Sequence, residues 1–181
     1  MSFVLYGSSA ARGIAIGHVV LFGRKRSDVV ELRVDPNALE EEKKRLVSAI
    51  ARTNSYLTGV KNTIPGSAPK ELVSFVDTHI QIVGDETLLE GVCSLINQHH
   101  CNSEWALNLY QESLLSVFEE MQDAYFEARK ADIRHVLDLV LTNLSVGRDQ
   151  GGSRHRPIKG GVVAAADLSP ADLIILCRGG V

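Results

Sequence analysis

One stretch of the sequence, residues 71–86, places side chains of different chemistry on a single helical face. Its members follow one another at i, i+4, i+7/8, i+11 and i+14/15, and they are Glu71, Phe75, Thr78, His79, Ile82, Asp85 and Glu86. This spacing keeps them on one side of a helix. Apolar groups rimmed by charge are typical of protein-binding surfaces. The pattern therefore predicts a docking face, with the alternative that Phe75 and Ile82 pack against a neighbouring helix.

The charge around this face is strongly acidic. From Glu71 to Glu127 there are 11 acidic residues and no lysine or arginine. Residues 35–146 carry a net charge of −8, whereas the rest of the chain carries +5, which together give −3. Such a stretch repels nucleic acid and favours a basic protein partner. The alternative is a solvated helical surface that is acidic without a partner.

Other groups of reactive side chains form weaker patterns. Cys93, His99, His100 and Cys101 lie close together in the sequence but lack the ligand pairs of structural zinc sites. The basic loop from Gly147 to Gly161 contains glycines but matches no phosphate-binding motif, which favours a linker. We identify no catalytic triad. A zinc-dependent or redox protein is therefore a minor alternative, and no metal or cofactor is expected for this chain.

Length and composition limit the class of protein. The chain has 181 residues, 45% of them apolar, which suits one globular domain or one domain with an insertion. No apolar run approaches the roughly 20 residues of a membrane span, and the start lacks the features of a secretory signal. Three cysteines without a CxxC pair argue against a disulfide framework. A cytoplasmic, reduced protein is expected.

The elements that must position the docking face are mostly helical. Helix-start signals at Asp35-Pro36, Ser67-Ala68-Pro69, Asp85 and Asn102-Ser103 each precede apolar residues at helical spacing, and a further helix is predicted over residues 123–145. Short connections between these helices favour an antiparallel bundle.

Strands are predicted on both sides of this helical block. β-branched residues indicate one or two short strands within Ile14–Leu21, fed by a loop, and further strands at Val162–Ala166 and at Leu173–Leu176. Between the last two, Ser169-Pro170 has the form of a helix start. One α/β domain with a helical subdomain inserted into it explains this order.

Four motifs support a more specific interpretation. They are Arg12-Gly-Ile-Ala-Ile-Gly17, Phe75-x-x-x-His79-x-x-Ile82-x-x-Asp85-Glu86-x-Leu88, Tyr125-x-x-x-Arg129-x-x-Asp132-Ile-Arg134-x-Val136 and Val163-Ala-Ala-Ala-Asp167-Leu-Ser-Pro170. In these motifs and their order, the chain resembles the N-terminal region of Enzyme I, the phosphoenolpyruvate–protein phosphotransferase of the bacterial phosphotransferase system.

The resemblance implies an α+β fold, in which an α-helical bundle subdomain (residues 35–146) is inserted into an α/β phosphohistidine swivelling domain (residues 1–34 and 147–181). In that family the helical subdomain docks HPr, a small phosphocarrier. The positions that the resemblance assigns to HPr docking are Glu71, Phe75, His79, Ile82, Asp85, Glu86, Phe118 and Arg129. Ser169 matches a hydroxyl residue that in the family hydrogen-bonds the active histidine.

One departure from the family affects the chemistry. The family's phosphohistidine lies in a Gly-Gly-x-x-Ser-His type of segment, which this sequence lacks, and neither His135 nor His155 matches it. The resemblance also implies a barrel that binds phosphoenolpyruvate and magnesium and forms the dimer, and we expect none within these 181 residues. We therefore expect a truncated, monomeric chain that docks HPr and is inactive in autophosphorylation. The alternative is a stand-alone helical interaction or regulatory module with a different basic partner.

Overall fold

A computed structural model describes residues 13–22, 29–119, 124–145, 160–165, 168, 172–173 and 176. The side chains of residues 22, 117–119 and 124–128 are outside the description. The elements in chain order are β1 (Val19–Phe22), the short 3-10 helix η1 (Pro36–Ala38), α1 (Leu39–Asn62), α2 (Lys70–Val83), α3 (Glu86–His99), α4 (Ser103–Glu119), α5 (Ala124–Ser145) and β2 (Val162–Ala165). The predicted helices are confirmed, and their bounds differ from the predicted ones by only a few residues.

Local signals account for where the helices begin. Asp35 accepts a hydrogen bond from the backbone amide of Asn37 at 2.9 Å and caps η1. Asp85 accepts one from the amide of Thr87, also at 2.9 Å, and caps α3. In each case a short acidic side chain satisfies an amide that has no partner within the helix.

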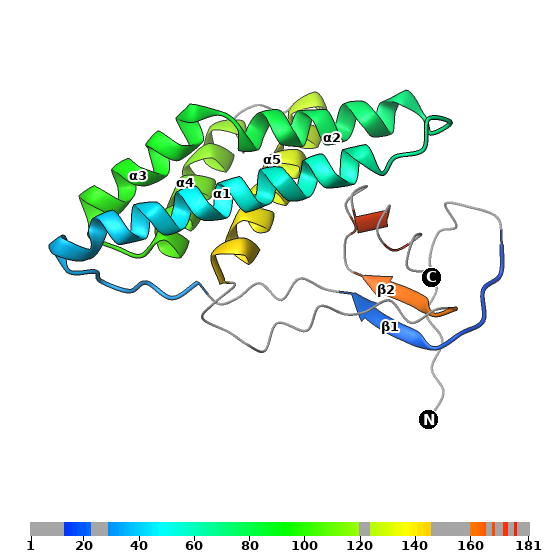
Figure 1. Ribbon diagram of the computed structural model, residues 1–181, viewed down its shortest axis with the longest axis horizontal. Coiled ribbons are helices and arrows are strands. Elements are labelled where there is room, and N and C mark those ends of the chain that lie inside the picture. Colours follow the sequence, from blue (N-terminus) through cyan, green and yellow to red (C-terminus); the bar gives the residue numbers. More distant parts are fainter. Residues whose placement is uncertain are drawn as a thin grey trace.

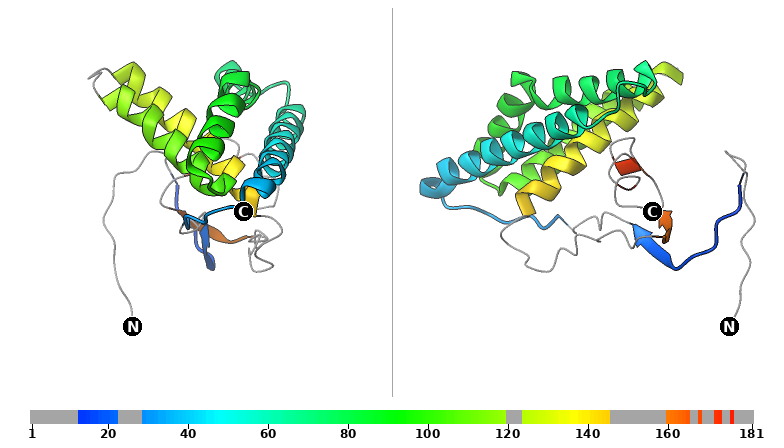
Figure 2. Two further views of the ribbon diagram at one scale, coloured as in Figure 1. Left: turned by 90° about the vertical axis from the view of Figure 1, so that its left-hand side faces the viewer. Right: turned by 45° about the vertical axis from the view of Figure 1, so that its right-hand side comes forward.

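The helices form a bundle in which α1 runs the full length of the block (Figure 1). Helices α2 and α3 follow one another alongside α1, and α4 and α5 complete the bundle. The view along the block in Figure 2 shows the helices gathered around one interior. The main core cluster draws residues from α1, α3, α4 and α5, including the fully buried Leu46, Val92, Ile96, Ala106 and Val140.

The two strands lie side by side although the whole helical block separates them in sequence. β1 pairs with β2 in parallel, with Val19 opposite Val162 and Phe22 opposite Ala165. Val20 is nearly buried, whereas its neighbours Val19 and Leu21 are 66% and 72% exposed. The helical block is therefore an insertion between two paired strands, as the sequence predicted.

At the chain's margins, one strand prediction is confirmed in part, by β1, and the other is wrong. Ile14 and Ile16 lie outside β1 and are 95% exposed. Asp172, Leu173 and Leu176 are helical where a strand was expected over Leu173–Leu176. A short apolar run fits a buried strand and a buried helix equally well, so periodicity alone does not separate them. Ser169-Pro170 and most of the Gly147–Gly161 loop lie outside the described residues.

The segment before α1 is attached to the far end of the bundle. The amide of Leu32 donates to Asn102 Oδ1, and the amide of Asn102 donates to the Leu32 carbonyl, both at 3.0 Å. The amide of Val34 donates to the His100 carbonyl at 2.8 Å. These bonds connect the segment to the α3–α4 turn.

No helix among the described residues is both long and apolar enough to span a membrane.

Candidate protein-docking surface

The predicted docking residues fall into three groups in the structure. Glu71, Asp85 and Glu86 are exposed along α2 and the start of α3. Phe75, Ile82 and Arg129 are partly buried, and His79 is fully buried. The side chain of Phe118, at the end of α4, and all of Ser169 lie outside the described residues. We refer to Glu71, Phe75, Ile82, Asp85 and Glu86 as the α2–α3 surface.

The expected surface position of His79 is wrong. The apolar residues Leu72, Val76, Ile80 and Val83 recur at helical spacing and would form the core stripe of α2, but the buried residues of this helix are Val76, His79 and Val83. Helix α2 contacts both α1 and α5, so its buried face is set by two neighbours and is turned toward His79. His79 consequently lies beneath the α2–α3 surface and does not form part of it.

A small polar cluster surrounds this buried histidine. His79 Nε2 lies 3.6 Å from Asp132 Oδ1, and the other oxygen of Asp132 lies 3.3 Å from the guanidinium of Arg129. The ring of Phe75 is 4.2 Å from that of His79 between centroids, and the His135 ring is 6.3 Å away. The cluster joins α2 to α5 and extends from the interior to Arg129, whose side chain is 40% exposed.

The two apolar members of the α2–α3 surface have a packing role as well. Phe75 packs against the cluster formed by Val60 and Val76. Ile82 packs against a second cluster that contains Leu57, Val83 and Val136. The alternative considered from the sequence, packing against neighbouring helices, therefore applies to both residues. Each keeps part of its side chain exposed, so packing and docking are compatible.

Asp85 occupies the junction where α2 ends and α3 begins. Its Oδ1 accepts hydrogen bonds from the Thr87 hydroxyl at 2.7 Å and from the Thr87 amide at 2.9 Å. These bonds hold the pKa of the Asp85 carboxyl below its ordinary value. Asp85 is thus ionised at neutral pH and fixed in place as a helix cap, and Glu86 follows it in the first turn of α3.

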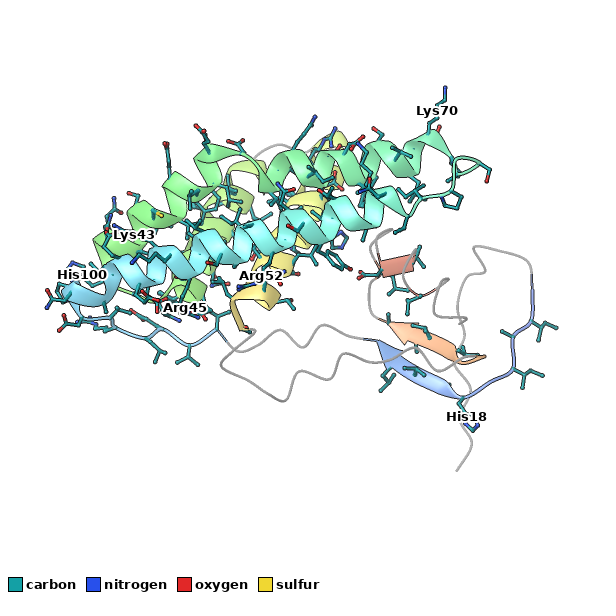
Figure 3. All side chains as sticks on the ribbon, viewed as in Figure 1. His18, Lys43, Arg45, Arg52, Lys70 and His100 are labelled. Carbon is teal, nitrogen blue, oxygen red and sulfur yellow. The ribbon has the colours of Figure 1, made fainter. Side chains whose placement is uncertain are left out.

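The acidic side chains on and next to the α2–α3 surface remain exposed in the folded chain. Glu71, Asp85, Glu86 and Glu90 are all exposed on α2 and α3. Lys70 is the first residue of α2, and Figure 3 shows it at the outer end of that helix. Because a helix rises about 1.5 Å per residue, Lys70 is roughly 20 Å from the α2–α3 junction. Its positive charge is adjacent to Glu71 and remote from Asp85.

A second polar network was not predicted from the sequence. Arg45 pairs with Glu42 at 2.7 Å and with Glu104 at 2.6 Å, and Ser103 donates to Glu42 from its amide and its hydroxyl. Arg52 donates to the Asn143 carbonyl at 2.7 Å. Figure 3 shows Arg45 and Arg52 pointing toward the end of α5. The i,i+3 spacing of Glu42 and Arg45 was the only sequence signal for this network.

The cysteine and histidine residues near the end of α3 show no sign of a reactive or metal site. Burial is the main cause that raises the pKa of the Cys93 and Cys101 thiols, which favours the protonated form. Among the described residues, no group of three or more His, Cys, Asp or Glu side chains is placed to hold a metal ion.

The fold and its surface together define an α+β protein with a helical block inserted between paired strands and an acidic, partly apolar face on that block. The chain belongs to the family described as PEP-utilising enzyme, N-terminal, which matches residues 6–129. It is 34% identical to the phosphoenolpyruvate-protein phosphotransferase of Cupriavidus necator, over 96% of this chain and 31% of that protein. The enzyme of the same name from Lactococcus lactis subsp. lactis is 28% identical, over 95% of this chain and 29% of its own.

Two solved structures have the same fold. The NMR solution structure of Enzyme I (nEIt) aligns with a TM-score of 0.75 at 24% identity, covering 94% of this chain and 68% of that one. The N-terminal domain of Enzyme 1 – Nitrogen aligns with a TM-score of 0.67 at 19% identity, covering 91% and 66%. The predicted α+β class and the resemblance to the Enzyme I N-terminal region are confirmed. The chain spans about 30% of the length of the curated relatives it matches.

Proposed function

We propose that this chain docks the phosphocarrier HPr through the α2–α3 surface, in the manner of the N-terminal part of Enzyme I. The observation that supports the proposal most is the arrangement of the surface itself. Exposed carboxylates lie before and after the partly exposed Phe75 and Ile82 along the chain, at Glu71, Asp85 and Glu86. A partner with a basic, partly apolar patch would match this surface in both charge and hydrophobicity.

The proposal assigns the phosphoryl chemistry to the complete family protein. That protein would transfer phosphate from phosphoenolpyruvate to a histidine and then to HPr, with magnesium bound in its barrel. The 181 residues contain no Gly-Gly-x-x-Ser-His segment. We therefore propose that this chain forms no phosphohistidine at the family's site. We also propose that it docks HPr as a cytoplasmic monomer and needs no cofactor to do so. Ser169 would support that histidine where both are present.

The first test is a titration of the full chain with HPr from the same organism, by calorimetry and NMR, at low and at high salt. Saturable binding that weakens with salt, with shifts centred on residues 71–86, is expected because exposed charges are screened. Binding that is absent at low salt would contradict the proposal. Strong binding of a different basic protein in its place would favour the stand-alone interaction module.

Charge-removing variants locate the contact. Glu86→Gln and Glu71→Gln are each expected to weaken HPr binding about two- to fivefold at low salt, which is the usual effect of one exposed ion pair. Asp85→Asn removes the charge and keeps a side chain that caps α3. Glu41→Gln, an exposed carboxylate on α1, is the matched control and should leave affinity unchanged. Equal effects at all four positions would show that only net charge matters.

A further inference from the structure

His79 is too deeply buried to touch a docked protein, yet it contacts a residue of the docking surface. Its side chain is 1% exposed. Its ring lies against that of Phe75, with a centroid separation of 4.2 Å and a tilt of 54°. Whatever His79 contributes to docking, it must contribute through its neighbours.

Asp132 connects the same histidine to a second residue near the surface. Its carboxylate is 14% exposed, with Oδ1 at 3.6 Å from His79 Nε2 and Oδ2 at 3.3 Å from the Arg129 guanidinium. One carboxylate thus lies between a buried ring on α2 and a guanidinium on α5 that is 40% exposed. Arg129 and Asp132 are three residues apart on α5, so both side chains lie on the same side of that helix.

Arg129 can donate hydrogen bonds to a partner, which the carboxylates of the α2–α3 surface cannot do. A guanidinium offers planar N–H donors to carbonyl or carboxylate oxygens of a partner. A free arginine side chain loses considerable rotamer freedom when it makes such bonds. A guanidinium held in place before docking loses less, and the saving appears as affinity.

We infer that His79 and Asp132 are positioning residues: they hold Phe75 and Arg129 in the arrangement that receives the partner. The inference rests on the proposed function, and it changes the role of His79 from a contact to a support beneath the surface. Among the described residues, the charged and titratable groups near the ring include Asp132 and His135 from α5, with Arg129 beyond Asp132. The competing explanation is that His79 only fills space between α2 and α5.

A double-mutant cycle on the full chain separates these explanations. His79→Met fills a similar volume with an apolar side chain that has no ring nitrogen, and it is expected to weaken HPr binding about fivefold, within the range for groups in one polar network. Adding Arg129→Met should cause little further loss, because the variant already lacks a positioned guanidinium. Adding Glu71→Gln should instead multiply the two losses. Independent effects of His79→Met and Arg129→Met would overturn the inference.

A conservative replacement adds a test that simple packing would fail. His79→Gln restores a polar group on the side that faces Asp132 and should restore most of the affinity that His79→Met loses. Equal affinities for the two variants would favour the packing explanation. If His79→Met does not fold, Asp132→Asn interrupts the same connection on the more exposed side and must show the same coupling to Arg129→Met.

The positioning role can also be measured without any partner. In the free chain, the Arg129 Nε–Hε group should show restricted motion by NMR, and His79→Met should increase that motion. Unchanged motion in a folded His79→Met variant would overturn the inference even if HPr binds. Absence of HPr binding by the wild-type chain, with the motion changed as expected, would instead remove only the proposed function.

Discussion

The helical block and the two-stranded sheet differ in how completely they bury their apolar side chains. In the block, Leu46, Leu57, Ile96 and Leu107 are buried almost completely. In the sheet, Val19 and Leu21 stay largely exposed, although β-branched and aliphatic residues dominate both strands. Parallel strands are usually covered on both faces, and a two-stranded sheet alone is marginal in water. Among the described residues, the fully buried apolar side chains therefore lie in the helical block, where we expect their contribution to stability to be largest.

This difference matters for the docking surface. The residues of the α2–α3 surface lie on α2 and α3, or, for Asp85, at the N-cap of α3. Both helices pack against other helices of the block. A surface built on packed helices keeps its shape before a partner arrives, which lowers the entropy lost on binding. The docking function we propose therefore depends on the region that the chain stabilises best.

The largest predicted effect tests where the stability lies. Leu46→Ala removes a fully buried side chain from α1, and we expect it to lower the free energy of unfolding by about 3 kcal/mol, because a cavity remains. Leu21→Ala makes the same chemical change in β1, where the side chain is exposed, and should cost below about 0.5 kcal/mol. Urea unfolding followed by far-UV circular dichroism measures both. Similar losses for the two variants would show that sheet and block unfold as one equally packed unit.

The sequence predicted the helical block well because its signals are local. Asp35 and Asp85 cap helices where the pattern placed them, and Pro65-Gly66 separates α1 from α2. These features depend on a few adjacent residues and do not require knowledge of the tertiary structure. The apolar run at Leu173–Leu176 lies close after the helix-start signal at Ser169-Pro170, but its β-branched and aliphatic residues favour a strand, and that predicted strand is wrong.

The site was harder to predict because it depends on contacts between helices. The orientation of α2 is set jointly by α1 and α5, so sequence spacing within α2 could not reveal that His79 faces inward. Asp132 was visible as part of a motif, but its position between His79 and Arg129 is a tertiary fact. The exposed carboxylates were predicted correctly as exposed, since a charged side chain without a buried partner remains in water.

The next prediction concerns the polar network of Glu42, Arg45, Ser103 and Glu104. It lies at the end of the block where Asn102 bonds to Leu32. Glu42 is 6% exposed and accepts hydrogen bonds from Ser103 and Arg45. Burial opposes its ionisation, but these hydrogen bonds and the Arg45 charge outweigh burial, so its pKa is lowered. We expect Glu42→Gln to cost about 2 kcal/mol at neutral pH, as for other buried groups that lose a charged hydrogen-bond partner.

The same variant should change the pH dependence of stability. A carboxyl group with a lowered pKa in the folded state stabilises the fold above its unfolded pKa, about 4.3 for glutamate, and loses that contribution as the pH falls further. Wild-type protein should therefore lose more stability than Glu42→Gln between neutral and acidic pH. Parallel pH profiles in urea unfolding would show that the pKa of Glu42 does not change on folding, which would contradict the prediction. Glu41→Gln, one residue away and exposed, serves as the control.

The smallest predicted effect distinguishes packing from helix propensity inside the block. Gly91 on α3 lies against Tyr110 of α4, and a Cβ atom there would collide with the tyrosine ring. Gly59 on α1 has no such neighbour within 4 Å. Gly59→Ala should raise the free energy of unfolding by about 1 kcal/mol through better helix propensity. Gly91→Ala gains the same propensity but must displace the ring, and we expect a net loss of about 1 kcal/mol.

The free energy of unfolding is expected to rise for Gly59→Ala and to fall for Gly91→Ala. This difference in sign would identify packing against Tyr110 as the cause of the loss at Gly91. Both replacements are glycine to alanine within a helix, so propensity alone would make both stabilising. If the Tyr110 ring is the obstacle, Gly91→Ala should become stabilising in a Tyr110→Ala background, where that ring is removed. Thermal and urea unfolding of the four variants measure this reversal. A destabilising Gly91→Ala change that persists without the ring would place the constraint in the α3 backbone instead of at the α3–α4 contact.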